Sequence, residues 1–214
     1  MKRVLDYRLF YRRSLPHYQP QSGIFFITYR LHFDLPPDFR DKIKSRKIQL
    51  ASKKQFQPDE LDKILFDGFD NYLALCNTSP KYLTEPKIAE IVMQSLDKMA
   101  NKQYKLYCYC IMPNHVHILI QPLVKQKGRY FSLAEIMRGH KGATANRINK
   151  ILHKQEHIWH GESYDHHVRS QEEFDRILFY IINNPVKAGL VKNYSDWPYL
   201  WIDNKILSSR NFLK

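Results

Sequence analysis

The stretch KLYCYCIMPNHVHILIQPL, residues 105–123, determines what kind of sheet this chain builds. Its first part, KLYCYCIM at 105–112, is an apolar and aromatic run that is too short for a core helix and predicts a strand. The chain then turns at Pro113-Asn114 and continues as a second apolar run, HVHILIQPL at 115–123. Two apolar strands joined by a tight proline-containing turn predict an antiparallel hairpin at the centre of a sheet.

Two histidines in the second run, His115 and His117, flank Val116. Successive side chains of a strand point to opposite faces, so both imidazoles are expected on one face and Val116, Ile118 and Ile120 on the other. Two neutral imidazoles side by side on a central strand can share one divalent cation, or each ring can be satisfied separately by hydrogen bonds. Because burying two polar rings costs free energy that a metal would offset, the metal pair is the favoured interpretation.

The segments on either side of this hairpin complete an alternating pattern of elements. Strands are expected at 23–31 and within 157–168, and helices at 60–75, 86–101, 132–152 and 171–184. Ser132 as N-cap and Glu135 predict a capping box, while Gly139 and Gly142 weaken the helix that follows. Pro185 is expected to stop the last helix. This order predicts an α+β fold in which helices pack on the faces of an antiparallel sheet.

The chain is expected to form a single domain over residues 1–214, because 43% of its residues are hydrophobic and supply one substantial core. Residues 1–22 are basic and rich in tyrosine, and they are expected to form either an N-terminal arm that tracks a DNA strand or an ordinary extended terminus packed on the core. Residues 33–75 are expected to be a peripheral insertion, whose charged and proline-punctuated part at 33–58 predicts irregular or peripheral structure. Residues 192–214 are expected to be a mixed C-terminal tail.

The charge of the chain favours a protein that binds nucleic acid. The sequence carries 34 Lys and Arg residues against 21 Asp and Glu, a formal net charge of +13. Cationic side chains release counterions from the phosphate backbone, so a globular protein this basic is often a nucleic-acid binder. The alternatives are a charge that serves solubility or attraction to an anionic membrane. Membrane attraction is disfavoured because we find no basic amphipathic helix with a Trp- or Phe-rich face.

We expect no membrane association and no export. The sequence has no run of about 18 apolar residues, and MKRVLDYRLFYRRS at 1–14 lacks the apolar core of a signal peptide. The three cysteines, Cys76, Cys108 and Cys110, form no CxxC pair, which argues against a cysteine metal site. Cys108 and Cys110 alternate within an apolar run and are expected in the core of a reduced, cytoplasmic protein.

Tyr180 and Asn184 stand four residues apart in the last expected helix. At about 100° per residue they share one helical face, one turn apart. An aromatic nucleophile and an amide oxygen would then meet a metal held by His115 and His117. The alternative is that Tyr180 belongs to an apolar core stripe and that Asn184 serves as a C-terminal cap.

Three segments together resemble a known family: MPNHVHILIQP (112–122), YDHHVRSQEEFDRILFYIINNPVKAGLV (164–191) and DWPYLW (196–201). They are similar to the REP-associated tyrosine transposases, which belong to the HUH superfamily of single-tyrosine transposases. The resemblance runs from GIFFITYRL at 23–31 to about Ser195, apart from the insertion at 33–75, to which it assigns no role.

The resemblance implies a ferredoxin-like or RRM-like sheet core and a defined set of site residues. His115 and His117 would be the metal ligands, Asn184 the third protein ligand and Tyr180 the nucleophile, with Mg²⁺ or Mn²⁺ as the metal. The histidine pair at 166–167 adds a histidine beside the family's pattern, so the approach of either ring to the site stays open.

The implied activity is cleavage and rejoining of single-stranded or hairpin DNA through a 5′-phosphotyrosine intermediate, in transposition or in the processing of REP-like hairpins. The alternative is a catalytically inactive, host-retained protein that binds DNA hairpins. A phosphoesterase that uses water as its nucleophile is a further option, and the choice between monomer and homodimer stays open. Contacts to DNA are expected from cationic side chains along the chain: Arg8, Arg12, Arg13, Arg30, Arg138, Lys141, Arg147, Lys150, Arg169 and Lys187.

Overall fold

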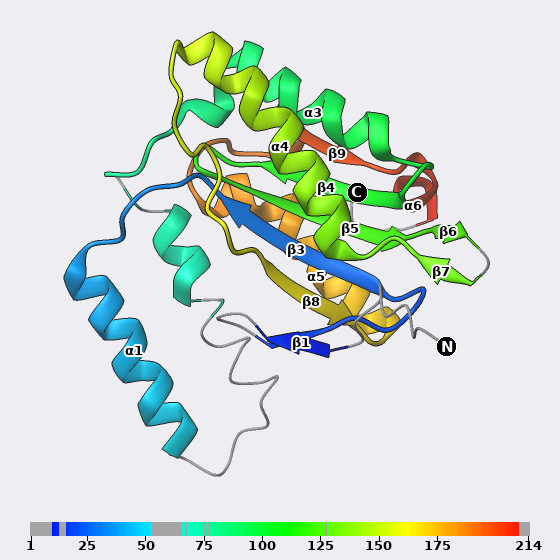
Figure 1. Ribbon diagram of the computed structural model, residues 1–214, viewed down its shortest axis with the longest axis horizontal. Coiled ribbons are helices and arrows are strands. Elements are labelled where there is room, and N and C mark those ends of the chain that lie inside the picture. The colour runs from blue at the N-terminus through cyan, green and yellow to red at the C-terminus, as the bar shows by residue number, and fades with distance from the viewer. Residues whose placement is uncertain are drawn as a thin grey trace, which may run out of the picture.

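A computed structural model of the chain describes residues 10–12, 16–52, 66, 68–74, 76, 78–126 and 128–209 (Figure 1). Among these residues the main sheet has five antiparallel strands in the order β8-β3-β5-β4-β9. The strands are β3 (Ile24–Arg30), β4 (Tyr104–Ile111), β5 (His115–Pro122), β8 (Tyr164–Val168) and β9 (Leu200–Ile202). The predicted hairpin is therefore confirmed as the pair β4 and β5, and β5 is the central strand.

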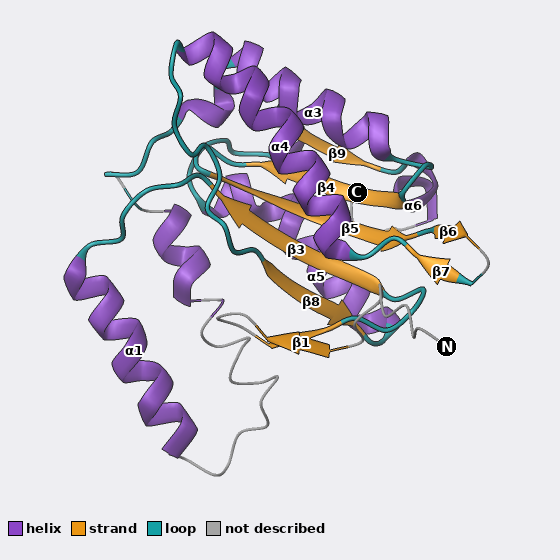
Figure 2. Cartoon of the chain, in the orientation of Figure 1, coloured by secondary structure: helices purple, strands orange, loops and turns teal. Residues whose placement is uncertain are grey.

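Helices cover both faces of this sheet (Figure 2). One face carries α3 (Pro86–Met99) and α4 (Leu133–Leu152), and the other carries α5 (Gln171–Lys187). Val116, Ile118 and Ile120 pack in the core cluster under α3 and α4, whereas Leu119 packs in the cluster under α5. The α+β fold with helices on an antiparallel sheet is thus confirmed, as is the capping box of Ser132 and Glu135 at the start of α4.

The prediction that Pro185 stops the last helix is wrong. The helix α5 continues through Pro185 to Lys187, and the N–H of Ala188 still donates to the carbonyl of Asn184. Because Pro185 stands only two residues before the helix ends, its missing N–H removes one hydrogen bond from the last turn. The N–H of Leu190 donates to the carbonyl of Pro185 and closes the helix end.

The segment at 33–75 is more regular than the sequence predicts. Residues 37–52 form the helix α1 (Pro37–Ser52), because a proline in the first turn is followed by Lys, Arg and Gln, which favour helices without an apolar stripe. Residues 68–74 are also helical, and we call them the Asp70 helix. The rings of Phe39 and Tyr72 stack with centroids 3.6 Å apart, so α1 packs on the Asp70 helix.

Both ends of the described chain carry small elements. The tail expected at 192–214 contributes the short helix η2 (Tyr194–Asp196), the edge strand β9 and the helix α6 (Asn204–Ser209), so it is partly built into the fold. At the other end, β1 (Phe10–Arg12) pairs with β2 (Pro16–Tyr18). Further short elements are η1 (Tyr82–Thr84), β6 (Val124–Gln126) and β7 (Arg129–Tyr130). Within the described part of the chain, no helix combines the length and hydrophobicity needed to cross a bilayer.

Candidate active site

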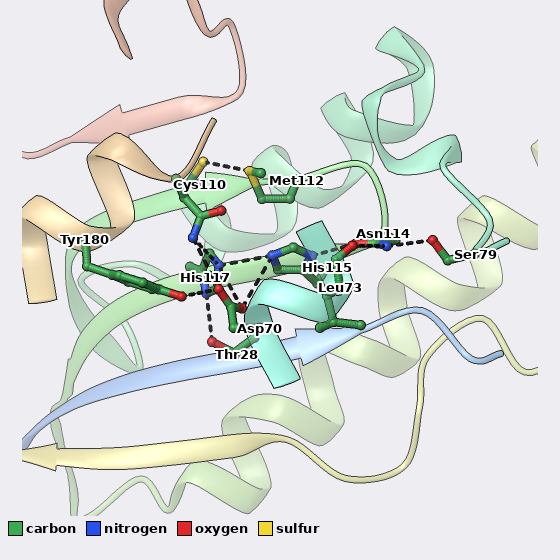
Figure 3. A network of polar contacts seen from close by, with 11 residues as sticks. Thr28, Asp70, Leu73, Ser79, Cys110, Met112, Asn114, His115, His117 and Tyr180 are labelled. Carbon is green, nitrogen blue, oxygen red and sulfur yellow. Dashed lines mark hydrogen bonds and ion pairs between the residues drawn. The ribbon is translucent and has the colours of Figure 1, made fainter. Parts of the chain in front are cut away.

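The two histidines of β5 lie on the α5 face of the sheet, as their spacing predicts, and both are fully buried. Their Nε2 atoms face each other at 3.1 Å, with the imidazole rings nearly perpendicular at 78° (Figure 3). Two lone pairs cannot stay at this distance without a proton or a cation between them, because they repel each other. The arrangement is that of two ligands aimed at one point.

Hydrogen bonds fix which nitrogen of His115 carries the proton. The Nδ2 of Asn114 donates to the carbonyl of Leu73 at 2.8 Å and to the hydroxyl of Ser79 at 2.6 Å. The Oδ1 of the same amide therefore faces Nδ1 of His115, at 2.6 Å, and it can only accept. Nδ1 of His115 must carry the hydrogen, which leaves the lone pair of Nε2 available to a metal.

Thr28 holds the ring of His117 from the neighbouring strand, through a hydroxyl that can either donate or accept. The Nδ1 of His117 lies 2.7 Å from the hydroxyl of Thr28, which is its register partner on β3. Burial lowers the pKa of His117 below its usual value, and it lowers the pKa of His115 to about 3. Both imidazoles are therefore neutral near pH 7, the state that a metal ligand requires.

The helix α5 brings Tyr180 and Asn184 to these histidines, as the four-residue spacing predicts. The Nδ2 of Asn184 lies 3.2 Å from Nε2 of His117, and Asn184 is only 2% exposed. The ring of Tyr180 lies edge-on to the ring of His117, with centroids 5.7 Å apart. Tyr180 is half-buried, so the candidate nucleophile is the part of this group that reaches the surface.

The sequence analysis missed one member of the cluster, Asp70. Its carboxylate is 1% exposed and accepts hydrogen bonds from the Tyr180 hydroxyl and, at 3.4 Å, from Asn184. Burial raises the pKa of Asp70, whereas the hydrogen bonds from Tyr180 and Asn184 lower it by favouring the charged carboxylate. A signal was present in the sequence: Asp70 shares a helical face with the buried Phe66 and Leu73, which places a carboxylate in an apolar stripe.

These residues fit a divalent metal. The ligand atoms of Asp70, His115 and His117 all lie within 4.8 Å of one another. The Oδ1 of Asp70 is buried and has no hydrogen-bond partner among the described residues, which is costly unless an ion satisfies it. Turning the amide of Asn184 by 180° would direct its oxygen at the same point, since amide nitrogen and oxygen are assigned from their contacts alone. Two imidazoles with oxygen donors suit Mn²⁺ better than Mg²⁺.

The structure places Arg30 in the core, which does not fit the predicted DNA contact. Arg30 is 7% exposed, and its guanidinium donates to the carbonyls of Leu31 and Phe33. It also lies over the ring of Phe33, at 4.6 Å, and near the ring of Phe69, at 5.8 Å. Its position links β3 to the Asp70 helix, so we leave Arg30 out of the DNA-binding set.

The ammonium group of Lys141 is also engaged in hydrogen bonds within the protein. It donates to the carbonyl of His160 at 2.9 Å and to the hydroxyl of Ser163 at 2.8 Å, with longer contacts to two further carbonyls of this loop. The side chain therefore holds the loop that leads into β8. A phosphate contact would have to replace these four acceptors, which makes Lys141 a weak candidate.

The other predicted DNA-binding residues fall into three groups. Lys187 and Arg169 are exposed on the side of α5, and the ammonium of Lys187 lies 5.5 Å from the centre of the Tyr180 ring. Arg138, Arg147 and Lys150 are exposed on α4, on the opposite face of the sheet from Tyr180. Arg8 and Arg13 lie outside the described residues, and for Arg12 the structure describes only the backbone, in β1.

Neither histidine of the pair at 166–167 belongs to the cluster. The Nε2 of His166 lies 3.0 Å from a carboxylate oxygen of Glu173 at the start of α5. The ring of His167 packs against Phe25, which belongs to the core cluster on the other face of the sheet. His166 therefore connects β8 to the start of α5 through its contact with Glu173.

Comparisons with known proteins place the chain among transposases. A family model described as "Transposase IS200 like" matches residues 73–184, just over half of the chain. A Haemophilus influenzae protein whose name places it among the REP-associated tyrosine transposases is 28% identical over 102 residues, which cover 45% of this chain and 57% of that protein. The REP-associated tyrosine transposase of Escherichia coli is 40% identical over 42 residues, 20% of this chain and 26% of that protein. The chain thus matches between about a quarter and just over half of the length of these relatives.

Among solved structures, the fold is similar to that of a REP-associated tyrosine transposase bound to a REP hairpin. The TM-score is 0.54 at 17% identity, and the match covers 89% of this chain and 80% of the other. This likeness supports the fold. The matched family segment begins at residue 73, so it contains His115, His117, Tyr180 and Asn184 but starts after Asp70. With the family model matching more than half of the sequence, the chain belongs to the IS200-like transposase family.

Proposed function

We propose that this transposase cleaves and rejoins single-stranded DNA through a covalent 5′-phosphotyrosine bond to Tyr180, with a divalent metal held by His115, His117 and Asn184. The observation that carries the proposal is the convergence of a buried imidazole pair from β5 with a half-buried tyrosine and an amide from α5. The two Nε2 atoms lie 3.1 Å apart beside a buried carboxylate oxygen that has no hydrogen-bond partner among the described residues, and one cation would satisfy all three atoms.

The chain's own residues would position the reacting groups. Asn114 and Thr28 fix the rings of His115 and His117 from behind, so that both Nε2 atoms face the same point. Tyr180 would attack the phosphorus, forming a bond from its oxygen while the bond from phosphorus to the 3′ oxygen breaks. The phenol loses its proton and the 3′ oxygen leaves as a hydroxyl, so the balance needs no further reactant.

A bound Mg²⁺ or Mn²⁺ would supply charge to stabilise the phosphoryl oxygens as negative charge builds on them. Lys187 is placed to assist from the protein side. Its ammonium lies 5.5 Å from the centre of the Tyr180 ring, and a nearby cation favours the phenolate that develops during attack. Because the covalent bond conserves the energy of the cleaved phosphodiester, a second 3′-hydroxyl can reverse the step and join DNA.

We further propose hairpin DNA of the REP type as the substrate. The net charge of +13 favours a polyanionic partner. The names of the two relatives point to the same class, and the solved structure of similar fold is bound to a REP hairpin. For the oligomeric state, the sequence leaves two possibilities, a monomer and a homodimer.

The direct test is to incubate the protein with hairpin DNA that has a single-stranded flank, in the presence of Mn²⁺, and to look for a denaturation-resistant protein–DNA adduct. We expect an adduct with the wild type and with Tyr130→Phe, a matched change on β7, and none with Tyr180→Phe.

Two outcomes would favour other functions. DNA binding without any adduct in the wild type would indicate a non-catalytic hairpin-binding protein. Cleavage that survives Tyr180→Phe but is lost in His117→Ala would indicate a metal-dependent phosphoesterase that uses water.

A further inference from the structure

We propose that Asp70 is an additional protein ligand of this metal, and that its second carboxylate oxygen holds the Tyr180 hydroxyl in position. The inference rests on the proposed function, because it concerns the same metal and the same nucleophile. It assigns a role to the segment at 33–75, most of which precedes the matched family region.

The first oxygen of Asp70 completes a triangle of ligand atoms. Oδ1 lies 3.4 Å from Nε2 of His117 and 3.7 Å from Nε2 of His115, and the two Nε2 atoms are 3.1 Å apart. Two ligands that each lie about 2.1 Å from one ion, at angles between about 90° and 109°, are separated by about 3.0–3.4 Å. The observed separations are close to this range and need little movement to meet it.

A bound ion explains why this carboxylate oxygen can be buried, whereas packing alone does not. Oδ1 has no hydrogen-bond partner among the residues that the structure describes, although Asp70 is 1% exposed. A divalent cation placed between this oxygen and the two Nε2 atoms would satisfy all three at once.

The second oxygen connects the metal position to the nucleophile. Oδ2 accepts hydrogen bonds from the Tyr180 hydroxyl and from Nδ2 of Asn184. One carboxylate therefore contacts both the metal-facing and the tyrosine-facing sides of the site, and Figure 3 shows Asp70 close beside His117. In this position it restricts where the phenol oxygen can lie relative to the ion.

Packing holds the Asp70 helix over the histidines. Four residues before Asp70, the ring of Phe66 stacks on Tyr164 of β8, with centroids 4.0 Å apart, and meets Phe26 of β3 edge-on at 5.4 Å. Within the helix itself, Phe69 lies near the buried guanidinium of Arg30. Contacts with two strands fix the helix, so the place of Asp70 is determined by the sheet that carries the histidines.

A hydrogen-bond relay couples this helix to His115. Asn114 donates to the carbonyl of Leu73, three residues after Asp70, and accepts from Nδ1 of His115. The amide of Asn114 thus orients the ligand His115 and also anchors the helix that carries Asp70, the proposed additional ligand. Such shared anchoring is typical of groups that support metal ligands.

The test is Mn²⁺ binding to the full-length protein without DNA, measured by isothermal titration calorimetry. We compare the wild type with Asp70→Asn, with His117→Ala, and with Asp41→Asn, which removes the same charge from an exposed position on α1. Asparagine keeps the shape of aspartate and can still accept from Tyr180. We expect Asp70→Asn to raise the Mn²⁺ dissociation constant by about 10- to 100-fold, and Asp41→Asn to leave it unchanged.

The comparison separates failure of this inference from failure of the proposed function. If the wild type binds Mn²⁺ and His117→Ala does not, but Asp70→Asn binds like the wild type, Asp70 is no ligand and the histidine site stands. If the wild type and His117→Ala bind equally or not at all, the metal site itself is refuted. Thermal melting without metal checks that Asp70→Asn is folded.

Cleavage measured against Mn²⁺ concentration gives a second readout. A lost ligand can be offset by more metal, so we expect higher Mn²⁺ to restore part of the cleavage in Asp70→Asn, and none in Tyr180→Phe. An Asp70→Asn protein that cleaves faster than the wild type at every Mn²⁺ concentration would overturn the inference, because the carboxylate would then be restraining the nucleophile.

Discussion

Asn114 is the residue on which the orientation of His115 depends, because its amide oxygen accepts from Nδ1 and leaves Nε2 free. We predict that Asn114→Ala raises the Mn²⁺ dissociation constant by about 10-fold or more, since groups behind metal ligands typically contribute that much. Calorimetric titration measures the effect. Asn183→Ala is the matched control, because the Asn183 side chain donates to a backbone carbonyl of its own helix. Equal affinity in wild type and Asn114→Ala would show that the ring needs no such partner.

Local periods predict that His115 and His117 share one face of a strand and that Tyr180 and Asn184 share one face of a helix, whereas the roles of these residues are implied by the family resemblance and stay a prediction. Residues two apart in a strand lie on one face of the sheet, and residues four apart in a helix lie on one face of the helix. The structure shows both relations. Asp70 could not be placed in this way. Its distance of 45 residues from His115 carries no periodicity, and its position depends on how the Asp70 helix docks on the sheet.

At the scale of elements, α4 is tied to the sheet through a buried polar cluster. His140 is 1% exposed and lies 2.6 Å from the Tyr29 hydroxyl of β3 and 2.9 Å from the Ser95 hydroxyl of α3. Burial lowers the pKa of His140 to about 3, against an ordinary value of 6.5. The folded protein therefore keeps this ring neutral where the unfolded chain would protonate it.

This cluster predicts a pH dependence of stability. Above pH 6.5 the contribution of His140 is fully present. It falls by about 1.4 kcal/mol per pH unit as the pH drops from 6.5 toward 3, because protons bind to the unfolded chain. We expect the free energy of unfolding of His140→Gln to fall less steeply between pH 7 and pH 4.5 than that of the wild type. Denaturant titrations at the two pH values measure it, and parallel losses would contradict the assignment.

Strongly periodic elements could be predicted from the sequence, whereas the others could not. The strands β3, β4 and β5 follow from apolar runs too short for core helices, and the helices α3 and α4 follow from helical spacing of apolar residues, both of which local sequence carries. The strand β9 is only three residues long and pairs with β4 at a distance of about ninety residues, so its strand state depends on tertiary contact. The helix α1 lacks an apolar stripe and is recognisable only from its helix-forming composition.

At the scale of the whole molecule, the exposed cations predict salt-dependent DNA binding. Lys187 is the cation nearest the nucleophile among the predicted DNA contacts that the structure describes. Each neutralised phosphate adds about 0.7 to 0.9 to the slope of log affinity against log salt. We expect Lys187→Ala to lower that slope by about one, and Lys98→Ala, on α3, to leave it unchanged. A slope that Lys187→Ala does not alter would remove this lysine from the interface.

The structure also bears on whether one molecule can carry a complete site. Tyr180 lies beside the histidines of its own chain, since α5 packs on the sheet that contains β5. We therefore predict that mixing the inactive Tyr180→Phe and His117→Ala proteins does not restore the DNA adduct. Recovery of the adduct in the mixture would show that the tyrosine acts on a metal site in a second copy.

The central claim is that Tyr180 becomes covalently joined to DNA, and mass spectrometry of the protease-digested adduct tests it most directly. After reaction with hairpin DNA and Mn²⁺, followed by nuclease trimming, the account predicts a nucleotide-sized mass addition on the peptide that contains Tyr180. The addition should be absent when a chelator replaces the metal. An addition on any other residue, or cleaved DNA with no modified peptide, would contradict the account.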